Sequence, residues 1–314
     1  MIFSGKLSII IPCYNEQEII RETHRRIQQS LQKCEVKETE IIYINDGSED
    51  ATFDLLLEFS QENPEVKVID FARNFGHQAA ISAGIHHCTG DLAIIIDADL
   101  QDPPELFADL IETYQRENCN VVFCVRRNRH GESWLKKITA KMFYRFISRI
   151  CERPFPQDTG DFRLIDRMVM EEFKKLKEKN KFIRGLIFWL GFRQVPFYFE
   201  RDSRKTGATK YSLARMVRFA VTGITYFSNK PLIWAFKVGI AIIIMAAIIF
   251  MAFFWFGWGQ AVSPYSFKVL FISVLFILFG LHFIILGILG IYLKNIFDEL
   301  KDRPEYIIRE IING

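Results

Sequence analysis

Two aspartates, Asp97 and Asp99, stand one residue apart directly after the apolar segment Leu92–Ile96. In an extended chain, side chains two residues apart point the same way, so both carboxylates face one side. Such hard oxygen ligands suit Mg²⁺ or Mn²⁺, which keep coordination positions open for water and phosphate. Gln101 follows Asp99 at the same two-residue spacing, so its side chain would point the same way. The pattern therefore predicts a divalent-metal site. The alternative is that acidic residues simply open a solvated loop ahead of a Pro-Pro pair.

Other polar residues also follow apolar segments. Leu7–Ile11 leads into Pro12-Cys13-Tyr14-Asn15-Glu16, and a second segment ends in Asn45-Asp46-Gly47-Ser48. Asp46 could accept hydrogen bonds from a ribose or a base, as acidic residues at strand ends do. The same residues could instead form an ordinary turn, and Glu16 could be a first-turn helix carboxylate favoured by the helix dipole.

Short apolar runs alternate with amphipathic segments over the first 125 residues or so. Strands buried on both faces, separated by helices, indicate an α/β fold with a mostly parallel, Rossmann-like sheet flanked by helices. Ligands bind such sheets beyond the carboxyl ends of the strands. The predicted strands are Leu7–Ile11, Glu40–Asn45, Val66–Asp70, Leu92–Ile96 and Val121–Val125, and the predicted helices lie near Glu16–Lys33, Ala51–Glu62, His77–His87 and Glu105–Arg116.

The C-terminal third contains two long apolar segments, about 236–258 and 269–293. Each is long enough to cross about 30 Å of hydrocarbon as a helix, so they predict a transmembrane hairpin. Lys and Arg flank the hairpin rather than its short connection, which places both termini and the first domain in the cytosol. A hairpin buried in a protein core is the alternative.

Two basic amphipathic segments, 133–150 and 211–227, suit helices that lie in the membrane interface. The alternative is that both pack on the globular domain as ordinary amphipathic helices. The predicted organisation is a cytosolic domain over 1–210, an interfacial helix over 211–230, two membrane helices within 231–295 and a cytosolic tail over 296–314.

Several other classes of protein are excluded or disfavoured. The net charge of +3 is small and says little about partners; no nucleic-acid partner is expected. Six cysteines form no CxxC pair, which disfavours a zinc site or a disulfide framework. No GxGxxG follows the first strand and no GxxxxGK[ST] occurs, which removes the dehydrogenase and P-loop classes. The six histidines are expected on the surface or in the core, with no ligand role.

The chain resembles a known family through motifs that occur in the order IPCYNE, NDGS, RNFG, DADLQDPPE, DTGDFRL and RKTGATKY. These look like family 2 glycosyltransferases of GT-A fold. More narrowly they resemble the polyprenyl-phosphate glycosyltransferases, which include dolichol-phosphate mannose synthases and bacterial undecaprenyl-phosphate glucosyltransferases. The resemblance covers nearly the whole chain.

The resemblance implies roles for individual residues. Pro12, Tyr14, Glu16 and Asp46 would hold the nucleoside, with Asp97 also facing the nucleotide sugar, and Asp97, Asp99 and Gln101 would hold the metal. Asp158 would lie near the reacting sugar, and Arg204 would belong to a loop that closes over both phosphates. Members of the family more often have Asp where this chain has Asn45, and Ser where it has Thr209.

The expected function is transfer of a hexose from a nucleotide-diphosphate sugar to a polyprenyl phosphate, in an integral protein of the cytoplasmic membrane. UDP-glucose and undecaprenyl phosphate are favoured by resemblance of the two-helix architecture alone. GDP-mannose as donor, or a non-catalytic nucleotide-binding scaffold, are the alternatives, and homo-oligomers are left open. Cations for the acceptor phosphate are predicted at Arg126, Arg127, Lys137, Arg204 and Lys210. For the cations that follow the fifth strand, ordinary attraction to anionic lipids is the alternative.

Overall fold

The computed structural model describes residues 3–126, 159–179, 181–199, 230–256 and 264–314. They form two compact units. The first contains the described residues up to Phe199 together with Arg303–Gly314, and the second contains residues 230–302. The predicted interfacial segments, 133–150 and 211–227, lie outside the described residues.

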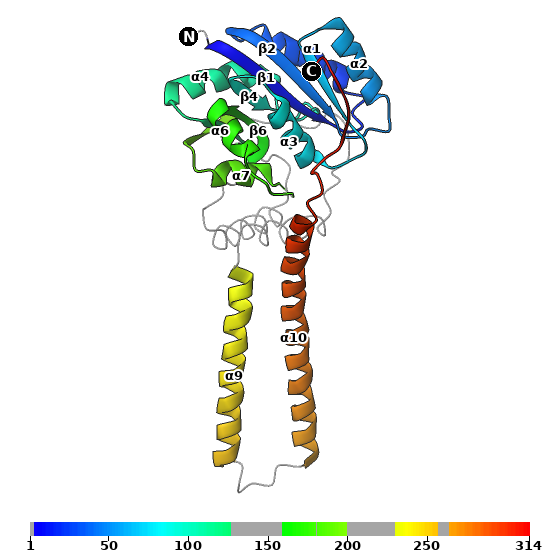
Figure 1. Ribbon diagram of the computed structural model, residues 1–314. Coiled ribbons are helices and arrows are strands. Elements are labelled where there is room, and N and C mark those ends of the chain that lie inside the picture. Colours follow the sequence, from blue (N-terminus) through cyan, green and yellow to red (C-terminus); the bar gives the residue numbers. More distant parts are fainter. Residues whose placement is uncertain (1–2, 127–158, 180, 200–229, 257–263) are drawn as a thin grey trace. The chain divides into compact units, whose positions relative to one another are not determined.

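An eight-stranded sheet forms the centre of the first unit, in the order β7-β5-β6-β4-β1-β2-β3-β8 (Figure 1). Neighbouring strands β3, β2, β1 and β4 are parallel, whereas β6 runs antiparallel to β4 and β5, and β8 antiparallel to β3. The strands are β1 Phe3–Cys13, β2 Val36–Asn45, β3 Val66–Phe71, β4 Leu92–Ile95, β5 Val121–Arg126, β6 Thr159–Asp166, β7 Gln194–Phe199 and β8 Ile308–Ile312.

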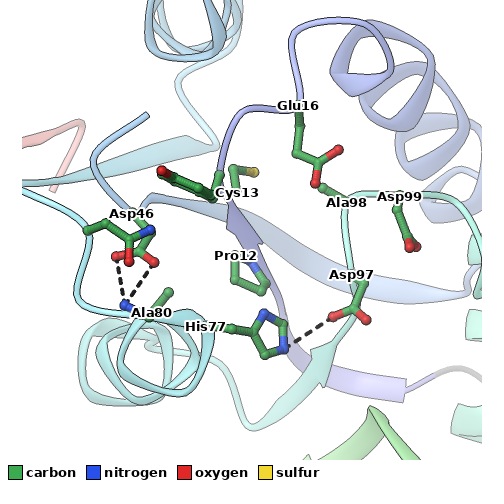
Figure 2. A pocket seen from close by; sticks show the side chains of 12 residues that line it. Pro12, Cys13, Glu16, Asp46, His77, Ala80, Asp97, Ala98 and Asp99 are labelled. Atoms are coloured by element: carbon green, nitrogen blue, oxygen red, sulfur yellow. Dashed lines mark hydrogen bonds and ion pairs between the residues drawn. The ribbon is translucent and has the colours of Figure 1, made fainter. Parts of the chain in front are cut away.

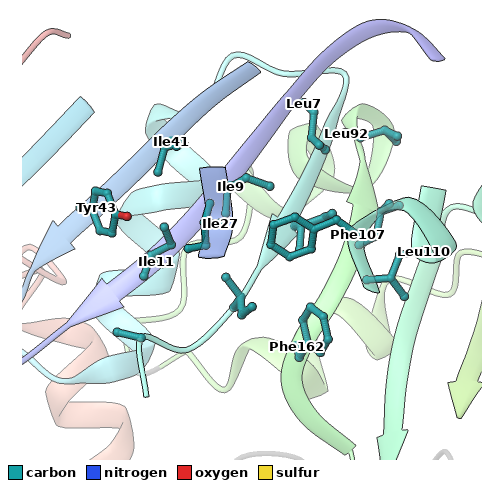
Figure 3. Packing of buried hydrophobic residues seen from close by; sticks show 14 of the residues in the cluster. Leu7, Ile9, Ile11, Ile27, Ile41, Tyr43, Leu92, Phe107, Leu110 and Phe162 are labelled. Atoms are coloured by element: carbon teal, nitrogen blue, oxygen red, sulfur yellow. The ribbon is translucent and has the colours of Figure 1, made fainter. Parts of the chain in front are cut away.

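Helices cover both faces of this sheet. One face packs against α1, α2 and α4, whose apolar side chains share a core with alternate residues of β1 such as Ile9 and Ile11 (Figure 3). The opposite face packs against α3, where Gly84 lies directly over Ile10 and Ile44. The helices of this unit are α1 Ile20–Leu31, α2 Thr52–Glu62, α3 His77–His87, α4 Phe107–Glu117, α6 Arg167–Lys174 and α7 Ile183–Trp189, with a 3₁₀ turn, η1, at Pro104–Leu106.

The predicted α/β fold and all five predicted strands are confirmed, as are the four predicted helices apart from a few residues at their ends. The strands β6, β7 and β8 were not predicted. Strand β8 (Ile308–Ile312) lies within the segment predicted from the sequence to be a C-terminal tail. It pairs with β3 and so belongs to the sheet of the first unit. The first unit is therefore completed by residues that follow the second unit in the sequence.

The second unit contains two long apolar helices, α9 (Lys230–Phe256) and α10 (Pro264–Leu300). Among the residues whose placement is described, one helical segment, Ile277–Leu300, is long and apolar enough to cross a membrane. A shorter apolar segment, Leu232–Ile242, lies in α9.

Candidate active site

A cavity of about 340 Å³ opens where the parallel strands β1, β2 and β4 end (Figure 2). This is the edge at which α/β sheets bind ligands. Polar and charged side chains from separate loops converge there. The lining residues are Pro12, Cys13, Tyr14, Glu16, Asp46, Asn74, Gly76, His77, Ala80, Asp97, Ala98 and Asp99.

The loop after β1 is braced against the loop after β2. Asn15 takes a left-handed conformation with φ of 55°, which a short amide side chain tolerates. Its backbone N–H donates to Ser48 Oγ at 3.1 Å, and its side-chain oxygen accepts from the N–H of Glu49 at 2.9 Å. These bonds hold the neighbouring Tyr14 and Glu16 at the cavity, where 43% of the Tyr14 surface is exposed.

Asp46 is buried and its carboxylate faces the loop that precedes α3. It accepts from the backbone N–H groups of Phe75 at 2.6 Å and Gly76 at 2.9 Å. Burial raises the pKa of Asp46, and the two backbone hydrogen bonds oppose that rise. The carboxylate therefore fixes residues 75–76 of the cavity wall, a role that the sequence did not reveal.

His77, the first residue of α3, contacts two carboxylates, one in β6 and one in the loop that follows β4. Its Nε2 atom lies 3.2 Å from Asp161 Oδ2 and 3.5 Å from Asp97 Oδ1 (Figure 2 shows the second contact). Burial by itself would lower the pKa of His77, but the hydrogen bond to Asp161 and the charges of both aspartates raise it to about 9. The protonated ring is thus a fixed positive charge beside the cavity at neutral pH.

The position of Asp161 follows from the antiparallel pairing of β6 with β4. Ile95 pairs with Arg163, and two residues further along the same register stand Asp97 and Asp161. The Arg184 guanidinium lies 3.5 Å from Asp161 Oδ1. Burial would raise the pKa of Asp161, but Arg184 and the hydrogen bond from His77 hold it well below its usual range.

The two carboxylates of the DxD motif fit a divalent cation. Asp97 Oδ1 is buried and has no hydrogen-bond partner among the described residues, and burial raises the pKa of this side chain to about 6. Asp99 lines the same cavity, and its Oδ1 accepts from the N–H of Gln101 at 3.1 Å. Gln101 is buried and is not one of the residues that line the cavity.

Within the described ranges, no three His, Cys, Asp or Glu side chains are grouped closely enough to hold a metal by themselves. An ion held by Asp97 and Asp99 would therefore need further ligands, which the oxygens of a bound diphosphate can supply.

Several predicted residues cannot be placed against this cavity. Arg126 ends β5, and its backbone pairs with Phe199. The others lie outside the described residues, namely Asp158, Arg127, Lys137, Arg204 and Lys210. The sequence, in turn, gave His77, Asp161 and Arg184 no role. Asp161 lies within the DTGDFRL motif and His77 directly follows the RNFG motif, so the motifs already pointed to one of these residues and to the neighbour of the other.

The chain is similar in sequence to known glycosyltransferases. The family "Glycosyl transferase family 2" matches residues 8–174. The uncharacterized glycosyltransferase YkcC of Bacillus subtilis is 43% identical over 308 residues, covering 96% of this chain and 93% of the relative. The SfII prophage-derived bactoprenol glucosyl transferase of Shigella flexneri is 36% identical, covering 98% of this chain and 99% of the relative. A solved glucosyl-3-phosphoglycerate synthase from Mycobacterium tuberculosis, in complex with Mn²⁺, UDP and phosphoglyceric acid, is 18% identical with a TM-score of 0.49, covering 70% of this chain and 76% of that one.

The mostly parallel sheet, the DxD motif at its carboxyl edge and these full-length relatives define a glycosyltransferase. The chain belongs to glycosyl transferase family 2.

Proposed function

We propose that this glycosyltransferase moves a hexose from a nucleotide-diphosphate sugar, UDP-glucose, to undecaprenyl phosphate at the cytosolic face of the membrane. The observation that carries the proposal is a cavity that joins Asp97 and Asp99 with Tyr14 and Asp46, in a chain similar over 98% of its length to bactoprenol glucosyl transferases.

The lining of the cavity supports the binding of a nucleotide diphosphate with its metal. Tyr14 and the polar loops after β1 and β2 would take the nucleoside, since an aromatic side chain and backbone polar groups can stack on and bond to a base. Asp97 and Asp99 would hold Mg²⁺ or Mn²⁺, which supplies charge neutralisation for the leaving diphosphate. His77 adds a positive charge next to Asp97.

In the proposed reaction, an oxygen of the lipid phosphate attacks the anomeric carbon of the sugar. The bond from that carbon to the diphosphate breaks, the configuration inverts, and a nucleoside diphosphate leaves. A phosphate monoester has a second pKa near 6, so the acceptor is largely dianionic at neutral pH and needs no strong general base. By family resemblance, Asp158 orients a substrate and Arg204, in the motif that includes Lys210, contacts the phosphates. Because they follow the fifth predicted strand and lead into a basic segment, Arg126, Arg127 and Lys137 are proposed to hold the acceptor phosphate with them.

Membrane attachment belongs to the same proposal. The segment Ile277–Leu300 is long and apolar enough to cross a membrane, and large side chains such as Ile277 and Phe283 are more than 60% exposed within the described part of the chain. Apolar side chains displayed all around a long helix suit a lipid surrounding. We place both termini in the cytosol, and the short connection between the two spans predicted from the sequence, 259–268, outside.

The test uses the full chain purified in detergent, incubated with undecaprenyl phosphate, Mg²⁺ or Mn²⁺ and a panel of labelled UDP- and GDP-sugars. We expect a chloroform-extractable labelled lipid with UDP-glucose, and we expect EDTA to abolish it. Label transferred only from GDP-mannose would replace the proposed donor. A folded protein that binds nucleotide but labels no lipid with any donor would refute transfer to polyprenyl phosphate.

A further inference from the structure

The C-terminal strand β8 lies along β3, the strand that leads into one wall of the cavity. The antiparallel register pairs Val68 with Ile312 and Asp70 with Glu310. One residue past β3, the N–H of Ala72 donates to the carbonyl of Ile307 at 2.9 Å. The pairing therefore extends beyond the strand into the loop that supplies Asn74, Gly76 and His77 to the cavity.

A chain of polar contacts runs from β8 to the residue beside Asp46. Arg309 Nη1 forms an ion pair with Asp70 Oδ2 at 3.1 Å, and Asp70 Oδ1 accepts from Asn45 Nδ2 at 2.6 Å. Asp70 and Asn45 are both buried, whereas the Arg309 side chain is 58% exposed. The partly exposed guanidinium supplies the counter-charge for a carboxylate inside the sheet, which would be costly to bury alone.

Aromatic rings form a second connection to the same place. Tyr306 stacks on Phe71 with ring centroids 5.0 Å apart, and Phe71 meets the edge of Phe75 at 5.8 Å. Phe75 is the residue whose N–H donates to Asp46 at 2.6 Å. Both connections thus reach Asp46 from the C-terminal segment, one through Asn45 and one through Phe75.

A third contact fastens the beginning of this segment to α3. Glu305 Oε2 accepts from Lys181 Nζ at 2.8 Å and from Ser82 Oγ at 2.9 Å, and both carboxylate and ammonium are largely buried. Ser82 lies in α3, the helix that begins with His77. Residues 305–313 therefore contact three elements around the cavity, namely β3, the loop after it and α3.

We propose that Arg309 is a positioning residue for the donor site: through Asp70 and Asn45, and through the carbonyl of Ala72, it holds the Asp46 carboxylate and the loop 72–77 in the conformation that binds the nucleotide sugar. Arg309 Nη2 donates to that carbonyl at 3.2 Å. The donor side of the proposal rests on the proposed function, whereas the effect on the loop does not.

The first test measures amide hydrogen exchange of residues 72–77 in the full chain in detergent, without ligand. In Arg309→Ala we expect this loop to exchange roughly 5- to 30-fold faster, while core amides of β1 are unchanged. Arg309→Lys, which keeps the charge, should restore part of the protection. Arg116→Ala is the matched control, because Arg116 is also a partly exposed arginine in an ion pair, with Glu117, on a helix that contributes no residue to the cavity.

The second test measures kinetics with the donor that the lipid-labelling experiment selects. Arg309→Ala should raise KM for the nucleotide sugar roughly 5- to 30-fold and leave KM for the lipid acceptor unchanged. In an Asp70→Asn background, Arg309→Ala should change the donor KM much less, because that background already lacks the ion pair between Asp70 and Arg309.

Unchanged exchange in residues 72–77 would overturn the proposal, and so would faster exchange spread equally over β1, which would mean general destabilisation. A wild-type protein that neither binds nor turns over any nucleotide sugar would refute the proposed function. In that case the exchange data would still decide whether Arg309 positions the loop.

Discussion

At the scale of single residues, the positive charge of His77 offsets the negative charges of two neighbouring aspartates. Asp161 lies in β6 and Asp97 follows the end of its antiparallel neighbour β4, and two carboxylates brought together repel each other. The imidazole contacts both, and Arg184 approaches Asp161 from α7. Because these four groups interact through their charges, removing the charge of one should change the electrostatic environment of the other three.

We predict that His77 makes the metal-free protein more stable at low pH than at high pH. Its pKa is raised from 6.5 to about 9, so its contribution is complete below about 6.5, declines as pH rises and is lost above about 9. Melting temperatures of the wild type and His77→Gln, measured in EDTA from pH 6 to 10, should converge as pH rises. A constant difference across that range would contradict the assignment.

Asp99→Asn should lower the turnover number about 100-fold or more, because it removes one of two carboxylates that we assign to the metal on the leaving diphosphate. Initial rates of labelled lipid formation measure this. Asp109→Asn, at an exposed position of α4, is the matched control and should keep full activity. If both variants made labelled lipid at the same rate, the assignment of Asp99 as a metal ligand would be wrong.

At the scale of elements, the packing of α3 on the sheet sets where His77 stands. Gly84 lies so close to β1 and β2 that an added Cβ would overlap Ile10 Cγ2 and approach Ile44 Cδ1 to 3.1 Å. Because glycine has no side chain, α3 can pack closely against the sheet at this position. The first residue of the helix, His77, then lines the cavity.

Gly84→Ala should therefore destabilise the domain by about 1–3 kcal/mol, the usual cost of overpacking a core. We expect a melting temperature several degrees lower, by about 2–4 °C per kcal/mol. Ile10→Ala would free the space, so the double variant should be more stable than the sum of the two single effects predicts. Additive losses would show that the close contact is not the cause.

At the scale of the whole molecule, the chain leaves its first unit for the apolar helices and then returns to complete the sheet with β8. This return requires both ends of the apolar unit to be accessible from the compartment that holds the sheet. A hairpin of two membrane helices meets that requirement, because an even number of crossings brings the chain back to the same side.

Cysteine labelling in intact cells tests this topology. The five described cysteines are buried, and Cys151 can be replaced by serine, so that labelling of the native cysteines stays low. A membrane-impermeant maleimide should label Ser263→Cys in intact cells, and Glu38→Cys, exposed on β2, only after permeabilisation. Labelling of both variants only after permeabilisation would contradict two crossings.

The sequence determined the features that depend on neighbours along the chain. Apolar runs such as Leu92–Ile96 fixed the buried strands, and the spacing of Asp97 and Asp99 directed both to the edge where parallel strands end. Pro12, Tyr14, Glu16 and Asp46 were likewise expected at strand ends, and all line the cavity. Period, polarity and motif order are local signals, and these predictions needed nothing else.

Only the tertiary structure decided which distant residues meet. Asp161 reaches Asp97 because β6 runs antiparallel to β4, and nothing in the residues of β6 specifies that partner or its register. The short, charged stretch Ile308–Ile312 becomes a strand because β3 offers it an unpaired edge, and Arg309 meets Asp70 only through that pairing. Strand partners are selected by hydrogen bonding and packing across the whole sheet, and a single sequence does not show that selection.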